Sequence, residues 1–234
     1  MGTLVGYRLK DSVATITMDD GKVNAISIQL LTELGAALDR AAADSAVVLL
    51  EGREGVFSAG FDLRVLAAGG DGALAMVRGG FELAARLLSF PTPVVAACTG
   101  HAVAMGAFLL LSADYRVGAA GPYRLVANEV AMGITMPYAA IEIVRQRLTP
   151  ACFTRAVLLA ETFSPDDAVA AGFLDRVVEP ARVSEAARET AEALTALDLK
   201  AHAASKARAR RQTLEAIRSG IAKELGTGAT WPPA

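Results

Sequence analysis

Apolar positions along the chain follow two patterns that alternate through its first half. Short apolar or β-prone runs predict strands, and leucines and alanines that repeat every three or four positions predict helices. Helical spacing begins after Ser27, a residue type that caps helices, and a second helix is expected from about residue 74 to 90, before Pro91 and Pro93. A third helix should end near Ala113. The expected strands span residues 7–10, 13–18, 47–50, 94–98, 114–117 and 123–126.

Polar and glycine residues between these segments predict turns. Asp11 and Ser12 separate the first two apolar runs, which predicts a hairpin. Residues 52–60 contain three glycines and are expected to form a loop. Because strands and helices alternate through residue 126, the pattern predicts an α/β fold.

The second half of the chain has a different pattern. From Pro137 onward it is mostly helical, with one short strand expected at residues 175–178. Residues 183–225 are rich in alanine, glutamate and arginine, with leucines and isoleucines at helical spacing. These features divide the chain into an α/β core at residues 1–180, a C-terminal helical region at residues 181–225 and a loose tail at residues 226–234.

The composition narrows the classes of function. Hydrophobic residues make up 53% of the chain and charged residues 21%, which predicts a folded protein with a sizeable core. The formal net charge of −2 gives no bulk attraction to nucleic acid or to an anionic membrane. The longest apolar run, residues 102–111, is too short to cross a bilayer. Without a signal-peptide pattern, and with Cys98 and Cys152 outside any CxxC motif, a cytoplasmic protein is expected.

Several common catalytic patterns are incomplete. Ser58, Asp114 and His202 occur in the chain order of an α/β-hydrolase triad, but Val56 stands where the nucleophile elbow requires glycine. Histidine occurs only twice and without ligand spacing, so no metal is expected. No GxGxxG or Walker loop is present for a nucleotide. The basic run that is interpreted as a solvated helix face comprises Arg208, Arg210 and Arg211.

Two glycine-containing loops remain, at residues 57–63 and 100–107. Each follows a buried run and leads toward a helix. Backbone N–H groups at a helix N-terminus are unpaired and partly positive, so two such loops that converge could hold an oxyanion. Spacing alone still favours the interpretation that both loops are ordinary strand-to-helix turns.

Five motifs in a fixed order favour the oxyanion site over ordinary turns. They are KVNAI at residues 22–26, FSAGFDL at 57–63, GHAVAMGA at 100–107 with DYR at 114–116, NE at 128–129 with GI at 133–134, and SPDDA at 164–168 with AGFLDRVV at 171–178. Together they resemble the crotonase (enoyl-CoA hydratase/isomerase) superfamily over roughly residues 5–225. The resemblance implies a spiral of ββα units that forms two roughly perpendicular sheets, followed by a helical region used in trimerisation. A homotrimer, or a hexamer built from two trimers, is therefore expected.

The resemblance also implies a substrate, an acyl thioester of coenzyme A, and no cofactor or metal. In the family two backbone N–H groups hold the thioester oxygen, and by resemblance they belong to Phe61 and Met105. Many members have glycine at the second position, so the Cβ of Met105 is expected to restrict the backbone there. Lys22 and Arg64 are candidate partners for phosphate. The walls around the nucleotide end of coenzyme A are expected at Asn24, Ala25, Ala59, Gly60, Asp62 and Leu63.

Two positions predict the reaction. Hydratases that this chain resembles carry two glutamates, which fall on Phe108 and Glu129, and Phe108 cannot ionise. Glu129 is the candidate base, and its apolar neighbours are expected to raise its pKa. The pattern is similar to that of Δ3,Δ2-enoyl-CoA isomerases, whereas the extra acid of dienoyl-CoA isomerases falls on Pro137. The expected acyl tunnel comprises Met76, Phe81, Phe108, Met136 and Tyr138.

An enoyl-CoA isomerase is the leading hypothesis, because one carboxylate suffices for a 1,3-proton shift. Two alternatives stay open. One is an enoyl-CoA hydratase of fatty acid β-oxidation that keeps only one of the two usual glutamates. The other is a catalytically idle member that binds acyl-CoA without turnover.

Overall fold

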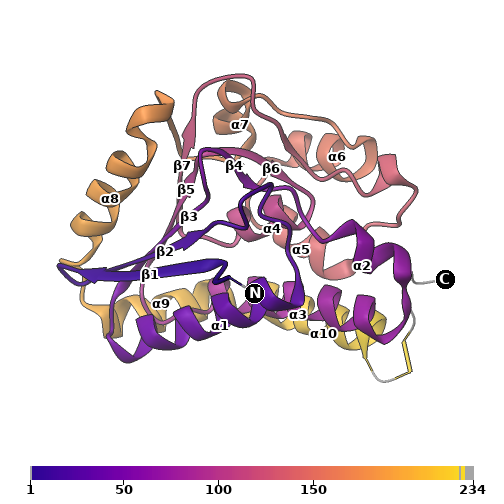
Figure 1. Cartoon of the computed structure of the whole chain (residues 1–234), viewed down its shortest axis with the longest axis horizontal. Helices are drawn as coiled ribbons and strands as arrows, with labels where there is room; N and C mark the ends of the chain where they lie inside the picture. Colours follow the sequence, from indigo (N-terminus) through magenta and orange to yellow (C-terminus); the bar gives the residue numbers. More distant parts are fainter. Residues whose placement is uncertain (1, 227, 230–234) are drawn as a thin grey trace.

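The computed structural model describes residues 2–226, 228 and 229, so the expected tail at residues 226–234 lies mostly outside the described residues. The strands are β1 (Val5–Lys10), β2 (Val13–Met18), β3 (Val47–Glu51), β4 (Gly55–Ser58), β5 (Val94–Cys98), β6 (Gly100–Val103), β7 (Tyr115–Ala119), β8 (Leu125–Val126) and β9 (Arg176–Val178). Within the described residues they form a six-stranded sheet, β1-β2-β3-β5-β7-β9, and a three-stranded sheet, β4-β6-β8 (Figure 1).

Helices surround both sheets. They are α1 (Ile28–Ala43), α2 (Leu63–Ala68), α3 (Gly70–Leu88), α4 (Met105–Leu111), α5 (Tyr138–Arg145), α6 (Pro150–Leu159), α7 (Pro165–Ala171), α8 (Val183–Leu194), α9 (Leu199–Ala209) and α10 (Arg211–Leu225), with 3-10 turns η1 (Val130–Met132) and η2 (Pro180–Arg182). Ser27 caps α1, because its Oγ accepts the Leu30 N–H at 3.2 Å. Within the described ranges, no helix is both long enough and apolar enough to span a bilayer.

A repeated ββα unit builds the two sheets. In each of the pairs β3–β4, β5–β6 and β7–β8, the first strand joins the large sheet and the second joins the small one. Neighbouring strands from successive units pair in parallel in both sheets. The spiral expected from the sequence motifs is therefore confirmed.

The expected elements differ from the observed ones mainly at the small sheet. Residues 52–60 were expected to be a loop, but β4 lies within them, and β6 lies in the stretch expected to turn toward a helix. Both strands have four residues and begin with glycine, too short for a period-two pattern to emerge. Helix α2 was not expected either, and α3 begins at Gly70 rather than near residue 74.

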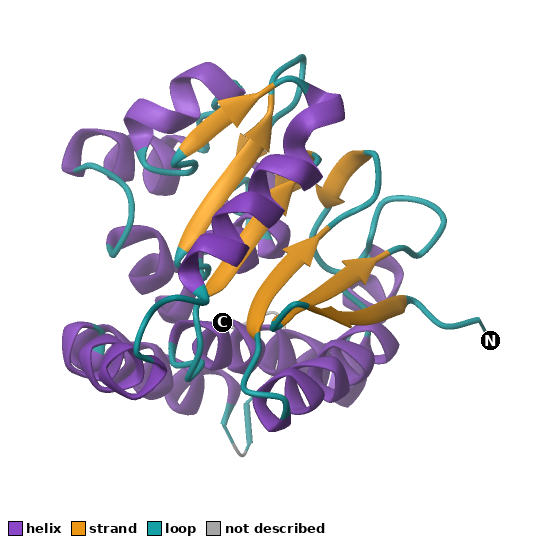
Figure 2. Ribbon diagram, turned by 90° about the vertical axis from the view of Figure 1, so that its left-hand side faces the viewer, coloured by secondary structure: helices purple, strands orange, loops and turns teal. Residues whose placement is uncertain are grey.

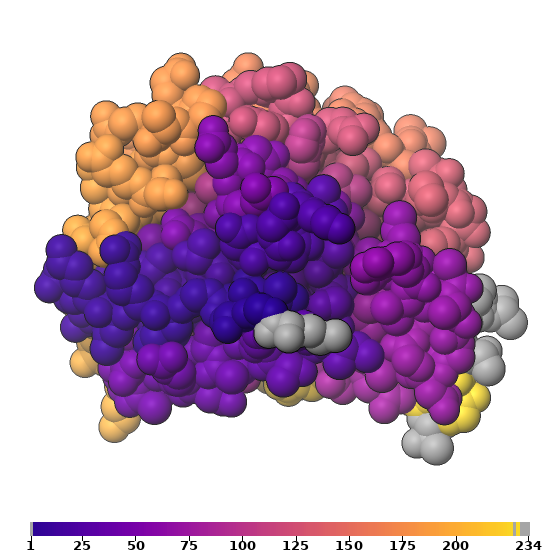
Figure 3. All heavy atoms as spheres, viewed as in Figure 1, coloured from indigo at the N-terminus to yellow at the C-terminus, as the bar shows by residue number. Residues whose placement is uncertain are grey.

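The inner strands of the large sheet are buried on both faces, and β3 shows why they are continuous apolar runs. Val48 and Leu50 point into the main core, which includes side chains of α1, α3, α4, α5 and α10. Val47 and Leu49 point the other way, into a second core against α8. Figure 2 shows the sheet between these helical layers. In the space-filling view the N-terminal residues (indigo) cover the front between α8 (orange) and the α2–α3 region (Figure 3).

A buried charge cluster connects the last two helices to this core. Asp114 lies directly before β7. Its Oδ2 accepts hydrogen bonds from the Lys206 ammonium at 2.6 Å and from the Val94 N–H at 2.8 Å. Its Oδ1 pairs with Arg210 at 2.9 Å, and Arg210 also donates to the Leu88 carbonyl at 3.0 Å. One carboxylate thus connects α9 and the start of α10 to the large sheet.

This cluster corrects the interpretation of the basic run as a solvated face. Arg208 and Arg211 are exposed, as expected. Arg210 differs, because its side chain is only 14% exposed and it binds Asp114. The periodicity of the run does not reveal this, since the partner lies far away in the sequence.

Replacing Asp114 with asparagine should destabilise the whole fold. The change keeps the side-chain volume but leaves Lys206 and Arg210 without their carboxylate, which typically costs about 3 kcal/mol. Chemical denaturation should report this loss in the free energy of unfolding. Glu215→Gln is the control, because the Arg211–Glu215 pair is exposed and should change stability by less than about 0.5 kcal/mol. Equal stabilities of the two variants would contradict the proposed role of the cluster.

Candidate active site

The two glycine-containing loops meet at the carboxyl ends of β4 and β6, which pair in parallel. Gly60 marks the contact, with a φ of +90° that favours glycine. A Cβ placed on Gly60 would lie 2.9 Å from the Val103 carbonyl oxygen and 3.4 Å from the Met105 nitrogen. The residue before Phe61 therefore lies directly against the residues that lead into Met105.

The Phe61 N–H is free because of how its neighbours pair. Ile26 and Phe61 form an isolated parallel bridge, in which Ile26 N–H donates to Gly60 O at 2.8 Å and Asp62 N–H donates to Ile26 O at 3.1 Å. In such a bridge the central residue directs its own N–H away from the partner strand. Within the described chain this N–H donates to no other residue.

The Met105 N–H is free because Met105 is the first residue of α4, where helical N–H groups have no acceptor within the helix. The expected backbone restriction falls one residue earlier. Ala104, the N-cap residue, has φ 49° and ψ −122°, while its own N–H donates to the Val126 carbonyl at 2.8 Å. The positive φ that opposes a Cβ therefore belongs to Ala104, and Met105 itself has helical backbone.

Glu129 follows β8 and is the N-cap residue directly before η1. Because Val126 bonds to Ala104, and three residues span at most about 11 Å, Glu129 lies near the start of α4. The residue as a whole is half-buried, but its Oε2 is shielded from solvent and has no hydrogen-bond partner among the described residues. Burial raises the pKa of the Glu129 carboxyl to about 7.

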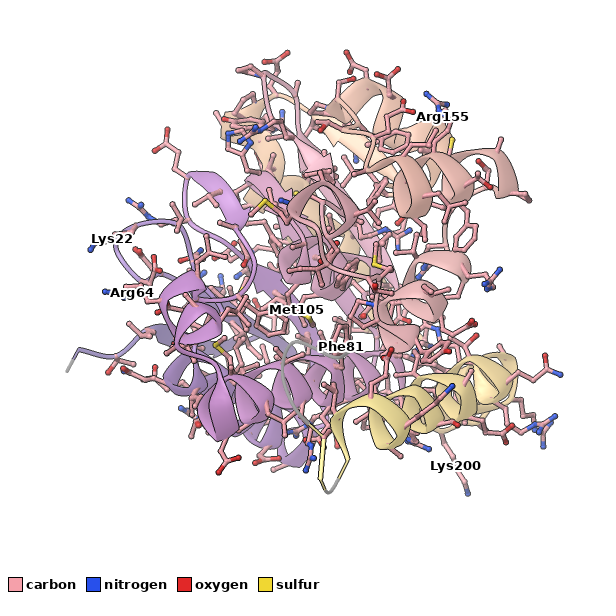
Figure 4. All side chains as sticks on the ribbon, turned by 90° about the vertical axis from the view of Figure 1, so that its right-hand side faces the viewer. Lys22, Arg64, Phe81, Met105, Arg155 and Lys200 are labelled. Atoms are coloured by element: carbon pink, nitrogen blue, oxygen red, sulfur yellow. The ribbon has the colours of Figure 1, made fainter. Side chains whose placement is uncertain are left out.

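A row of three aromatic rings begins at Phe61, one of the two donor residues. The Phe61 and Phe81 rings meet edge to face with centroids 6.3 Å apart, and Phe81 stacks on Phe108 at 6.2 Å. Phe108 is 1% exposed, so the position of the second family glutamate is filled by a buried ring. Figure 4 shows Phe81 and Met105 together in the interior.

The other candidate tunnel residues are divided between two environments. Met76 is fully buried and Met136 is 6% exposed, and Met136 belongs to the same core cluster as Phe81 and Phe108. Tyr138 is 47% exposed, and its ring lies 4.3 Å below the Lys223 ammonium of α10. The structure therefore groups four of the five residues in the interior and places Tyr138 at the surface beside α10.

Asn24 shapes the expected coenzyme A wall instead of lining it. Its side chain is fully buried, and Nδ2 donates to Met18 O at 2.9 Å and to Phe57 O at 3.2 Å. Asp20, which the sequence indicated only as part of a turn, accepts the backbone N–H groups of residues 22, 24 and 25 at 2.7 to 2.9 Å. An aspartate two to five residues before three loop donors is the signal that would have identified it.

The remaining wall residues differ in exposure. Ala25 is half-buried, Ala59 is exposed and Gly60 is buried. Asp62 caps α2 by accepting the Arg64 N–H at 2.9 Å, which directs the side chain of Leu63 outward, 68% exposed. Only part of the predicted wall is therefore open to a ligand.

Lys22 and Arg64 lie at one edge of the molecule, outward from Met105 (Figure 4). The Arg64 side chain is 90% exposed and pairs with Asp62 at 3.3 Å. Lys22 is exposed and forms no ion pair within the described residues. Both cations are therefore accessible to an anionic group.

The residues of the other catalytic patterns, a hydrolase triad and a metal site, do not come together in the structure. Ser58 is buried and donates to Asn24 O at 2.7 Å, while Asp114 is paired with Lys206 and Arg210. The rejected hydrolase triad therefore has both its serine and its acid bound elsewhere. In the described part of the chain, no group of three or more histidine, cysteine, aspartate or glutamate side chains is placed to hold a metal ion.

The chain is similar in sequence to known proteins. A sequence model described as enoyl-CoA hydratase/isomerase matches residues 8–227. Human mitochondrial enoyl-CoA delta isomerase 1 is 31% identical over 180 residues, which cover 75% of this chain but only 60% of the human protein.

Two solved structures are more similar still. An enoyl-CoA isomerase of Mycobacterium tuberculosis is 49% identical, with a TM-score of 0.93 over 97% of this chain and 100% of that chain. An enoyl-CoA hydratase of Mycobacterium ulcerans is 50% identical, with a TM-score of 0.91 over 93% of this chain and 96% of that chain. These relatives therefore bear the names of two different reactions.

Glu129→Gln should stabilise the protein at high pH only. The carboxyl pKa is raised from its ordinary 4.5 to about 7, so ionisation opposes folding as the pH rises through this interval. Removing the charge should add on the order of 3 kcal/mol to the free energy of unfolding at pH 8, and almost nothing at pH 4. Denaturation at both pH values measures the difference, and Glu54→Gln at an exposed site is the control. The same stability change at pH 4 and pH 8 would contradict the burial of this charge.

Proposed function

The chain belongs to the enoyl-CoA hydratase/isomerase family, whose enzymes act on thioesters of coenzyme A, and we propose that it converts 3-enoyl-CoA to 2-enoyl-CoA. The observation that carries this proposal is a single buried carboxylate, Glu129, with a ring, Phe108, at the position of the second acid. A 1,3-proton shift needs one group that can accept and return a proton. Addition of water needs groups that activate the water as well.

The proposed reaction starts with Glu129 ionised. Its carboxylate removes a proton from carbon 2, and the electron pair of the broken C–H bond moves into the thioester, giving a dienolate. The N–H groups of Phe61 and Met105 stabilise the negative oxygen, and one such donor is typically worth about 3 kcal/mol. The protonated Glu129 then delivers the same proton to carbon 4, and the double bond moves into conjugation with the carbonyl.

The pKa of Glu129 suits both halves of this cycle. A value of about 7 leaves a large fraction of the carboxylate ionised at neutral pH. It also makes that carboxylate a stronger base than an exposed glutamate, because burial disfavours the charge. The same group can therefore accept the proton from carbon 2 and release it to carbon 4.

We propose that the cations at the edge of the site bind the coenzyme A phosphates. Lys22 and Arg64 are exposed at one edge of the molecule (Figure 4), and Ala59 and Leu63, in the loop that precedes Arg64, are exposed apolar residues. A negatively charged nucleotide at this edge would place the thioester toward Gly60 and Met105.

A homotrimer is part of the same proposal. Four large apolar side chains on η1 and α6 are between 42% and 70% exposed, next to the segment that contains Glu129. They are Val130, Met132, Leu158 and Leu159. Exposed apolar groups of this size in neighbouring elements are typical of contacts between subunits. Subunit contact there would also keep water away from the proposed base.

A hydratase is the second candidate, because the Mycobacterium ulcerans relative bears that name at 50% identity. Phe108 opposes it in this chain. The ring is buried between Phe81 and the rest of the core, so neither an acid nor an ordered water has a place there. Weak hydration by Glu129 alone is the most this arrangement supports.

The purified protein should isomerise 3-enoyl-CoA, detected by the ultraviolet absorbance of the conjugated product. Glu129→Gln should lower kcat by roughly 1,000-fold, within the usual range for loss of a general base. Glu54→Gln should leave kcat unchanged. Hydration of 2-enoyl-CoA as the faster reaction would overturn the assignment, and binding measured by calorimetry without either reaction would show an idle member.

The pH dependence of kcat/KM should follow the ionisation of Glu129. Because the base must be ionised, kcat/KM should rise about tenfold per pH unit below pH 7 and become constant above it. A base with the pKa of an exposed glutamate would already give a constant value from about pH 6. A flat profile between pH 5.5 and pH 8 would therefore contradict a catalytic carboxylate with a raised pKa.

A further inference from the structure

One position in α3 contacts both proposed oxyanion donors. Gly79 and Gly80 lie in the middle of this helix, where glycine is unfavourable relative to alanine. Gly80 is buried, and a Cβ there would lie 2.6 Å from Cε1 and Cζ of Phe61 and 3.3 Å from Sδ of Met105. The side chains of both donor residues therefore lie against bare helix backbone.

We propose that Gly80 is a positioning residue, whose missing side chain sets how the Phe61 and Met105 N–H groups converge on the thioester oxygen. The inference rests on the proposed function, because it concerns the same oxyanion hole. It explains why an unfavourable residue occupies a helix interior, a position that would otherwise gain stability from alanine.

The Phe61 ring is also held by a second contact. It meets Phe81 edge to face with centroids 6.3 Å apart, and Phe81 is itself 1% exposed and stacked on Phe108. A methyl group on Gly80 must therefore turn the ring toward solvent or displace the backbone that carries it. That backbone is the segment between Gly60 and Asp62, whose hydrogen bonds to Ile26 direct the Phe61 N–H.

Met105 meets the same methyl group less closely. Its sulfur would lie 3.3 Å from the added Cβ, and because its side chain is fully buried, it must give way by a few tenths of an ångström within a packed core. A misplacement of about 1 Å at a reacting centre can cost on the order of 100-fold in rate.

Gly79 provides a matched control. A Cβ on Gly79 would lie 3.2 Å from Cδ1 of Leu31, the end of a flexible side chain in α1 that can shift slightly. Gly79→Ala therefore gives the same gain in helix propensity without contact to either donor. Any difference between the two alanine variants reports the contact with Phe61 and Met105.

The test compares Gly80→Ala and Gly79→Ala in the full-length protein with 3-enoyl-CoA as substrate. Gly80→Ala should lower kcat by about 10- to 100-fold with little change in KM, because the donors act on charge that develops in the transition state. Gly79→Ala should keep the kcat of the wild type. In difference infrared spectra, the carbonyl stretch of bound 2-enoyl-CoA should be less shifted in Gly80→Ala than in Gly79→Ala.

A rescue variant separates positioning from general disruption. Leucine at position 61 keeps the N–H but lacks the ring atoms that a methyl on Gly80 would contact, so Gly80→Ala should lower kcat less than threefold in the Phe61→Leu background. The same comparison applies if Gly80→Ala alone does not fold. A double variant that also fails to fold would overturn the inference.

The outcomes for the two proposals are distinct. Equal kcat values for Gly80→Ala, Gly79→Ala and the wild type would overturn the role of Gly80 and leave the isomerase assignment intact. A wild-type protein that does not isomerise 3-enoyl-CoA would instead overturn the proposed function.

Discussion

The site depends on the parallel pairing of β4, β6 and β8, because the carboxyl ends of parallel strands meet at one edge of a sheet. That edge brings Gly60 against Met105, and it connects Ala104 to the strand that leads to Glu129. Each of the ββα units contributes one strand to this small sheet and one to the large sheet. The large sheet, whose inner strands are buried on both faces, supplies the hydrophobic stability that keeps the small one in place.

The site contains polar groups without hydrogen-bond partners, whereas buried polar groups in folded proteins usually have them. The N–H groups of Phe61 and Met105 and the Oε2 of Glu129 have no partners among the described residues, and each such group typically costs about 1–3 kcal/mol when buried. Ala104 adds a strained backbone conformation directly before α4. Unsatisfied groups and strain in one place are typical of functional sites, where a ligand completes the interactions.

Sequence patterns predicted the strands of the large sheet well. Residues such as Val48 and Val94 belong to continuous apolar runs, which are typical of strands that are buried on both faces. In the small sheet the patterns missed β4 and β6, since four-residue strands that begin with glycine show no periodicity. Tertiary contacts explain the other errors. The burial of Asn24 and the ion pair of Arg210 come from residues distant in the sequence, which neither motif nor spacing indicates.

The central claim is that one carboxylate moves one proton, and deuterium transfer tests it most directly. 3-Enoyl-CoA labelled with deuterium at carbon 2 should yield 2-enoyl-CoA that retains part of the label at carbon 4, because the buried Glu129 exchanges slowly with water. Mass spectrometry during the first turnovers measures the retained fraction. Complete loss of the transferred deuterium to solvent from the first turnover onward would contradict a single shielded base.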